Sequence, residues 1–100
     1  MSYAKDRHDQ EAYLFAERFF GDEPFLTGVE YFGESRGELD AYGFIGDDLY
    51  IIEYKTRYTE NSRKKAIKQL KRAKDAAGIS GVMTHLIFAF EKNKYRELIL

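Results

Sequence analysis

The spacing of hydrophobic residues over the first half of the chain predicts one helix followed by three strands. Apolar side chains recur every three or four residues from about Asp6 to Phe20, which is helical spacing, and Gly21 and Pro24 then end the helix. Strands are expected where aromatic and branched residues cluster, over residues 25–32, 38–45 and 49–56. Two turn-prone segments separate these strands, 33–37 and 46–48, and the second has the length of a hairpin connection.

The second half predicts a further helix and two strands. Thr59 or Asn61 can cap a helix that runs to about Ala77 and ends at Gly78. Its inward stripe consists of Ala66, Ile67, Leu70, Ala73 and Ala77. Strands over 82–90 and 95–100 follow, joined by a turn at 91–94. The order of elements predicts one α/β domain over residues 1–100, with a mixed central sheet flanked by helices and a right-handed crossover through the second helix.

The strand at 49–55 carries the most informative charges. Its apolar residues occupy both alternating faces, which predicts a central strand that is covered on both sides. Glu53 and Lys55 project to the same face, and a charge in such a setting must be paired, bind a metal or lie at the open end of the strand. If residues 46–48 form a hairpin turn, Asp40 falls roughly opposite Glu53 and Lys55. Two carboxylates then converge beside one ammonium group.

Converging carboxylates are a typical site for a hard divalent cation. Mg²⁺ takes oxygen ligands, and a bound ion polarises a phosphoryl oxygen and lowers the pKa of its water. Lys55 would orient that water or neutralise charge that develops on the phosphate. These are the parts of a phosphodiester hydrolase. The alternative is that Glu53 and Lys55 form a solvent-facing ion pair of little energetic value.

These residues resemble a known family. Asp40 followed by Glu53-Tyr54-Lys55 resembles the PD-(D/E)xK nuclease superfamily, whose restriction-endonuclease-like core has the order αβββαβ. The segments 37–40 and 51–57 are similar to a pattern of YraN-like endonucleases, and archaeal Holliday junction resolvases share the motif. The resemblance implies that Asp40, Glu53 and the Tyr54 carbonyl bind Mg²⁺, with Mn²⁺ as a substitute, and that Lys55 is catalytic.

Two more site residues follow from the resemblance alone. Such families often add a glutamate from the first helix, for which Glu11 is the candidate and Glu17 the alternative. They also add a polar residue from the second helix, here Gln69. The chain departs from the pattern in having Leu39 where relatives have proline before the aspartate, and Ala73 where some relatives have a tyrosine; the second departure bears on the role of Gln69.

The formal net charge of −1 hides a separation of charge along the chain. Residues 55–75 contain nine basic and two acidic residues, whereas the remaining residues sum to −8. By itself the basic helix is most simply a solvated face; beside a phosphoesterase site it favours phosphate contacts. The basic residues nearest the motif are the candidates for nucleic-acid binding: Arg57, Arg63, Lys64, Lys65 and Lys68. DNA is preferred over RNA, and branched or nicked DNA is a substrate by analogy with the resolvases.

The remaining composition limits the function in other ways. The chain has no cysteine, its start is polar, and its longest apolar run, Leu86–Phe90, is too short to cross a bilayer, so we expect a cytoplasmic protein with no membrane partner.

His8 and His85 show no ligand spacing, so surface or core roles are expected, and Glu38 is expected to be structural. The eight Phe and eight Tyr mainly supply the core, and any aromatic surface left over would favour a homodimer. The rival class of function is a catalytically silent nucleic-acid-binding or protein-docking module.

Overall fold

A single mixed sheet lies between two helices. The computed structural model describes residues 3–32, 36–77 and 80–99. The elements follow the predicted order: α1 Tyr3–Phe20, β1 Phe25–Phe32, β2 Arg36–Ile45, β3 Asp48–Lys55, α2 Glu60–Ala77, β4 Thr84–Phe90 and β5 Lys94–Leu98. The α/β class is therefore confirmed. Among the described residues, no helix is long and apolar enough to cross a membrane.

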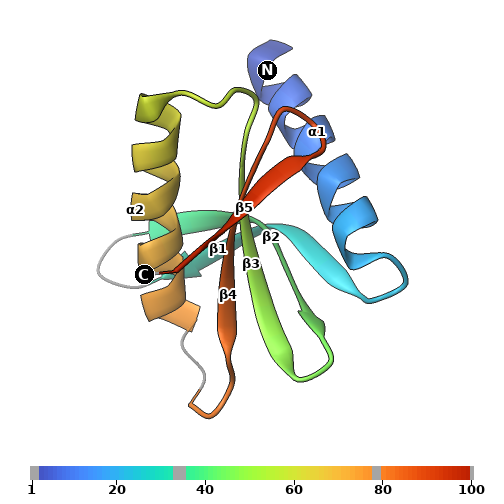
Figure 1. The fold of residues 1–100 in the computed structure, drawn as a ribbon, viewed down its shortest axis with the longest axis vertical. Helices are drawn as coiled ribbons and strands as arrows, with labels where there is room; N and C mark the ends of the chain where they lie inside the picture. The colour runs from blue at the N-terminus through green and yellow to red at the C-terminus, as the bar shows by residue number, and fades with distance from the viewer. Residues whose placement is uncertain (1–2, 33–35, 78–79, 100) are drawn as a thin grey trace.

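The five strands lie in the sheet in the order in which they occur in the chain. β1, β2 and β3 form an antiparallel meander, β3 and β4 are parallel, and β5 returns antiparallel to β4. The parallel step is made by α2, as the predicted crossover requires. β3 is the middle strand, which confirms the prediction from its two apolar faces. In Figure 1 the sheet separates α1 from α2, and β5 forms the near edge.

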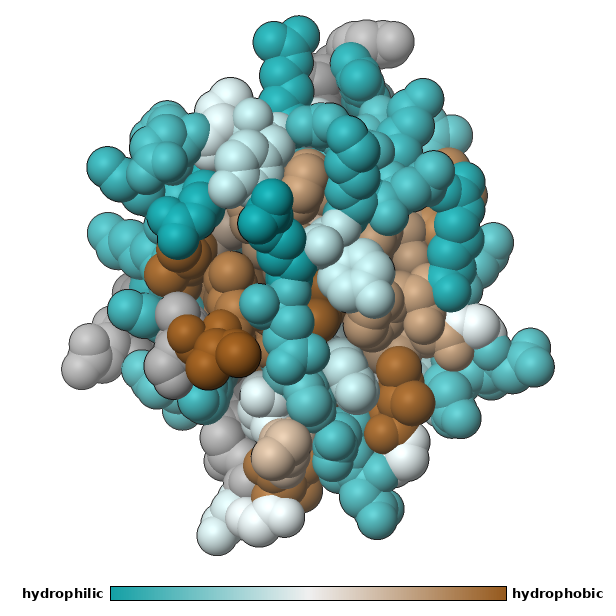
Figure 2. Space-filling view, viewed as in Figure 1, coloured by the Kyte–Doolittle hydropathy of each residue, from teal (hydrophilic) through white to brown (hydrophobic). Residues whose placement is uncertain are grey.

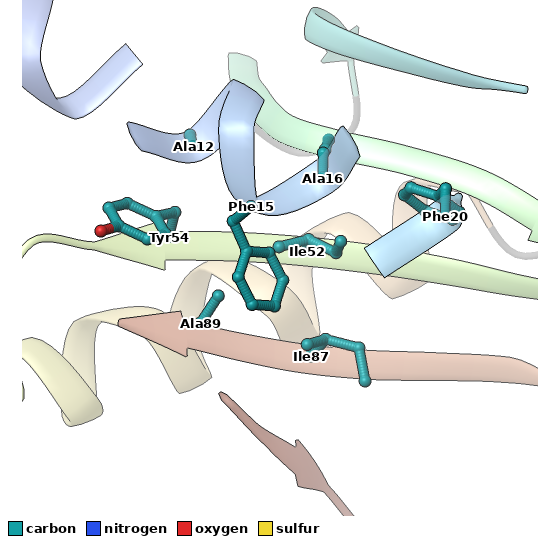
Figure 3. Close-up of a cluster of buried hydrophobic side chains, with 9 residues drawn as sticks. Ala12, Phe15, Ala16, Phe20, Ile52, Tyr54, Ile87 and Ala89 are labelled. Carbon is teal, nitrogen blue, oxygen red and sulfur yellow. The ribbon is translucent and has the colours of Figure 1, made fainter. Parts of the chain in front are cut away.

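Each helix covers one face of the sheet and completes a separate core. The α1 core combines alanine and phenylalanine from the helix with residues of the three inner strands; its members include Ala16, Phe15, Ile52, Tyr54, Ile87 and Ala89. Figure 3 shows the Phe15 ring projecting from α1 toward these strands. The α2 core contains Leu49, Ile51, Ala66, Leu70, Ala73 and Phe88. Because side chains alternate along a strand, Glu53 and Lys55 share the face of Ile51, toward α2.

The ends of the elements show which local signals were correct. Thr59 caps α2: its hydroxyl accepts from the Ser62 amide at 3.0 Å, and its own amide donates to the Ser62 hydroxyl at 2.8 Å, so Asn61 is not the cap. β4 begins at Thr84 rather than at Val82, and β5 spans 94–98 rather than 95–100. The predicted turn residues 33–35 and the predicted helix end at Gly78 lie outside the described residues.

Gly43 fixes how closely the start of β1 approaches β2. A methyl group at this position would lie 2.8 Å from the Pro24 carbonyl oxygen and 2.9 Å from the Phe20 ring. Only a residue without a side chain fits there, so the link between α1 and β1 packs directly on the backbone of β2.

Candidate functional site

The candidate site forms where β2 separates from β3. Their pairing runs from Ile45 opposite Asp48 to Ala41 opposite Ile52 and ends there. The next amide and carbonyl of β3 that face β2 belong to Tyr54, and side chains bind both of them. The Tyr54 N–H donates to Asp40 Oδ2 at 2.7 Å, and the Tyr54 carbonyl accepts from His8 Nε2 at 2.7 Å. The opened end of the ladder is thus filled by polar side chains rather than by a strand.

Three potential metal ligands converge at this opening. One ligand atom each of His8, Asp40 and Glu53 lies within 4.8 Å of the others. The three side chains come from α1, β2 and β3, so the site depends on the packing of the helix on the sheet. His8 Nε2 is 3.5 Å from Asp40 Oδ2, and only 6% of the Glu53 surface is exposed. The predicted convergence of Asp40 and Glu53 is therefore confirmed.

Burial and hydrogen bonding set the charge of this cluster. Burial, reinforced by the hydrogen bond to Asp40, raises the pKa of Glu53 to about 10, although the positive charge of Lys55 acts in the other direction. Burial alone would also raise the pKa of Asp40, but hydrogen bonds from His8, Glu53 and the Tyr54 amide outweigh burial and lower it. At neutral pH Glu53 is consequently a neutral acid that donates to the ionised Asp40.

His8 completes the charge balance. Both of its ring nitrogens face acceptors, since Nε2 contacts the Tyr54 carbonyl and Nδ1 lies 3.1 Å from Asp9 Oδ1. The hydrogen bond to Asp40 is the main cause that raises the pKa of His8 to about 9. An imidazolium therefore accompanies the Asp40 carboxylate, and His8, Asp40 and Glu53 together carry no net charge at neutral pH.

Glu11, the α1 residue predicted as a ligand, contacts the tyrosine of the motif instead. The Tyr54 hydroxyl donates to Glu11 Oε1 at 2.6 Å and accepts from the Lys92 amide at 2.8 Å, while Arg7 Nε donates to Glu11 Oε2 at 2.7 Å. The hydrogen bonds from Tyr54 and Arg7 lower the pKa of Glu11. The structure does not bring Glu11 into the group of converging ligand atoms. Glu17, the alternative, is exposed.

The Tyr54 contacts join three parts of the chain at one end of the sheet. Burial and the bond to Glu11 raise the pKa of the Tyr54 hydroxyl to about 12, so it stays protonated and keeps donating. The turn between β4 and β5, which supplies the Lys92 amide, has two consecutive residues with positive φ, Glu91 at 48° and Lys92 at 69°. Left-handed backbone at residues other than glycine is uncommon and is found preferentially near functional sites. Figure 1 shows this turn beside the first half of α1.

The other predicted catalytic residues lie on the α2 side. Lys55 is partly buried and projects to the same face as Glu53. Its positive charge acts to lower the pKa of Glu53 but does not outweigh burial and the contact with Asp40. Gln69 lies on the helix that covers this face, and in the described part of the chain its side-chain oxygen is buried without a hydrogen-bond partner. An unsatisfied buried acceptor is costly, so this oxygen is available for a donor such as an ordered water.

The predicted nucleic-acid-binding residues follow directly after the motif strand. Arg57, Lys64, Lys65 and Lys68 are exposed, whereas Arg63 is partly buried and lies 3.9 Å from Glu60. The Thr59 cap fixes the first turn of α2, so these basic side chains are carried by an anchored helix. A positive surface therefore begins within a few residues of Lys55.

The histidines differ from the sequence-based expectation. His8 lies in the cluster, and the available signal was its position three residues before Glu11, which places both side chains on one face of α1. His85 lies near the opposite end of β3, where its ring nitrogens are 2.9 Å from Asp48 and 3.3 Å from Glu97. This contact ties β3, β4 and β5 together. Glu38 lines a cavity of about 150 Å³ with Asp9 and Asp40 but is not part of the ligand group.

The donor set fits a hard or borderline divalent cation. Two carboxylates and a main-chain carbonyl are the oxygen ligands that Mg²⁺ and Mn²⁺ prefer, and an imidazole nitrogen suits Mn²⁺ better than Mg²⁺. In a comparison with known proteins, no protein-family model matches the chain and no curated protein matches its sequence.

Proposed function

We propose that the protein is a metal-dependent nuclease that hydrolyses phosphodiester bonds in DNA, on a restriction-endonuclease-like core. One observation carries the proposal. Asp40 and Glu53, on neighbouring strands, share a hydrogen bond at the opened end of the β2–β3 ladder, with the Tyr54 backbone and Lys55 beside them. Paired carboxylates with an adjacent lysine are the arrangement expected of a metal-assisted phosphodiester hydrolase.

The chain's residues divide into three roles. Asp40, Glu53 and the Tyr54 carbonyl would hold Mg²⁺ or Mn²⁺, and His8 would add a nitrogen ligand once Nε2 has released its proton. The ion supplies Lewis acidity and a more acidic bound water. Lys55 orients the attacking water and neutralises charge on the phosphate, and the free oxygen of Gln69 accepts a hydrogen bond from that water.

The basic first half of α2 supplies binding. Its exposed lysines, with Arg57, contact phosphates, and these contacts carry no sequence information. A protein that neutralises a few phosphates loses affinity steeply with salt. Because the total charge is only −1, the affinity for DNA should be modest and salt-sensitive.

Cleavage of a substrate panel tests the proposal. Labelled linear, nicked and branched DNA and single-stranded RNA are incubated with Mg²⁺ or Mn²⁺, with and without EDTA. We expect metal-dependent cleavage of at least one DNA, and a loss of roughly 10²–10⁴-fold in Lys55→Ala with binding retained. Lys74→Ala, at the far end of the same basic helix, is the control and should cleave normally. If the protein binds DNA but cuts none of the substrates with either ion, it is a binding module and the proposed activity is wrong.

A further inference from the structure

A second, larger hollow lies on the α1 face of the sheet. It has a volume of about 770 Å³ and opens between α1 and the edge strand β5. It forms because α1 packs mainly over β1, β2 and β3, whereas the sheet continues to β5. In Figure 2, which views the β5 edge, hydrophobic surface is exposed among polar side chains on both halves of the molecule, including the half that α1 occupies. The volume lies within the usual range for sites that bind small molecules.

Aromatic rings form most of the apolar lining. Phe15 and Phe19 come from α1, Tyr50 from β3 and Tyr95 from β5. Tyr95 meets the Phe19 ring edge to face, with centroids 5.4 Å apart and planes at 89°, and 52% of its surface is exposed. Phe15, by contrast, is only 4% exposed and belongs to the α1 core, so it connects these aromatic rings to the buried interior. A half-exposed ring that packs against the buried Phe15 ring is a platform on which a planar group can stack.

Polar groups at the hollow narrow the class of ligand. The Arg18 guanidinium donates to the Asn93 side-chain oxygen, and Glu97 contributes a carboxylate. Guanidinium, amide and carboxylate groups are those that pair with the edges of nucleobases, and arginine also binds phosphate. Stacking surface and hydrogen-bonding groups together therefore favour a planar heterocycle.

The hollow lies close to the candidate site. Asn93 follows Lys92, whose amide binds the Tyr54 hydroxyl, and the Phe15 ring lies 6.4 Å from the Tyr54 ring. The turn between β4 and β5 therefore contributes to both places. α2, with its basic residues, lies on the opposite face of the sheet.

We infer that the hollow between α1 and β5 binds an unpaired nucleobase of the nucleic acid that lies at the candidate site, with Tyr95 as the stacking residue. This inference rests on the proposed function and makes it more specific. It assigns to the protein a preference for single-stranded, flapped or distorted DNA over fully paired duplex, because only an unpaired base can enter the hollow.

Binding of matched oligonucleotides in EDTA tests the inference without cleavage. Fluorescence anisotropy compares a labelled single strand with the same strand in which abasic sites replace the bases, and with its duplex. We expect tighter binding of the strand that carries bases. Base stacking of about 1–3 kcal/mol corresponds to a roughly 5- to 150-fold loss of that affinity in Tyr95→Ala, with little change for the abasic strand. Tyr95→Leu, which keeps apolar bulk at this position, should show the same loss and separates stacking from folding.

Tyr13→Ala is the matched control, because Tyr13 is a similarly exposed tyrosine of α1 that contacts Phe25 and does not line the hollow. It should leave binding unchanged. Equal affinity for the base-containing and abasic strands, or no effect of both Tyr95 variants, overturns the inference and leaves the proposed function standing. Absence of all nucleic-acid binding and of cleavage overturns both. A shift from dimer to monomer in Tyr95→Ala, seen by sedimentation, identifies the hollow as an interface between copies of the chain and also overturns the inference.

Discussion

Replacement of Glu53 by glutamine should make the metal-free protein more stable. Glu53 keeps a proton in the folded state because burial and Asp40 raise its pKa from 4.5 to about 10. The unfolded chain releases that proton above pH 4.5, so unfolding becomes more favourable as the pH rises toward 10. Glutamine has the shape of the protonated acid, and its amide can donate to Asp40 in the same way. Glu53→Gln therefore retains the contact and removes the pH-dependent penalty.

The size of the effect follows from the pKa difference. Each pH unit between the unfolded and folded pKa values costs about 1.4 kcal/mol. At pH 7, which is 2.5 units above the unfolded pKa of 4.5, the penalty that glutamine removes is at most about 3.5 kcal/mol. The gain should be near zero at pH 4.5 and should increase between pH 5 and pH 8. For a domain of this size, 1 kcal/mol shifts the thermal midpoint by roughly 4–8 °C.

Urea denaturation in EDTA at pH 5, 7 and 8 measures the effect. Glu17→Gln, the same chemical change at an exposed position of α1, is the control and should shift the midpoint by little at any of these pH values. A Glu53→Gln variant that is no more stable than the wild type at pH 7 and 8 would show that Glu53 is ionised in the fold, and the account of the neutral cluster would be wrong. Mn²⁺ should stabilise the wild type and not the variant, since the variant lacks a carboxylate ligand.

Three further changes test individual contacts. Gly43→Ala should lower the free energy of unfolding by roughly 1–3 kcal/mol because its methyl group would meet the Pro24 carbonyl; an unchanged urea midpoint contradicts this. In metal-free protein the His8 imidazole should titrate near pH 9 by NMR, and Asp40→Asn should bring its pKa back toward 6.5; a value near 6.5 in the wild type refutes the ion pair. Tyr54→Phe should cost about 1–3 kcal/mol because Glu11 Oε1 and the Lys92 amide both lose their hydrogen bond to the hydroxyl, and equal stability in thermal melts would show that these contacts contribute nothing.

Much of the fold follows from local patterns in the sequence. The strand at 49–55 is apolar on both faces because both helices pack on it, and the short turn at 46–48 places β2 beside β3. The clearest error lies at the edge strand. Hydrophobicity predicts that Ile99 belongs to the last strand, yet 94% of its surface is exposed and it lies beyond β5. Hydrophobicity predicts a strand only where another element covers the residue.

The candidate site likewise contains contacts that the sequence predicts and contacts that it does not. Asp40 and Glu53 could be paired from the sequence because a hairpin fixes which residues are opposite each other. The contact between His8 and the Tyr54 carbonyl spans 46 residues and depends on how α1 lies across the sheet, which no local pattern reports. For Glu11 the resemblance to nucleases predicts a ligand, whereas the folded chain places its carboxylate on a hydroxyl. That ligand role stays a prediction.

The opened ladder at Tyr54 also gives the protein an internal spectroscopic probe. The Tyr54 amide donates to the carboxylate of Asp40 rather than to a carbonyl of a neighbouring strand. A charge-assisted bond of this kind is shorter and stronger than the usual bond between backbone groups. The nitrogen-bound proton of one residue should therefore resonate apart from the other strand amides and move whenever Asp40 changes its partner. A single backbone signal can then be followed during any titration of the site, with no label attached to a side chain.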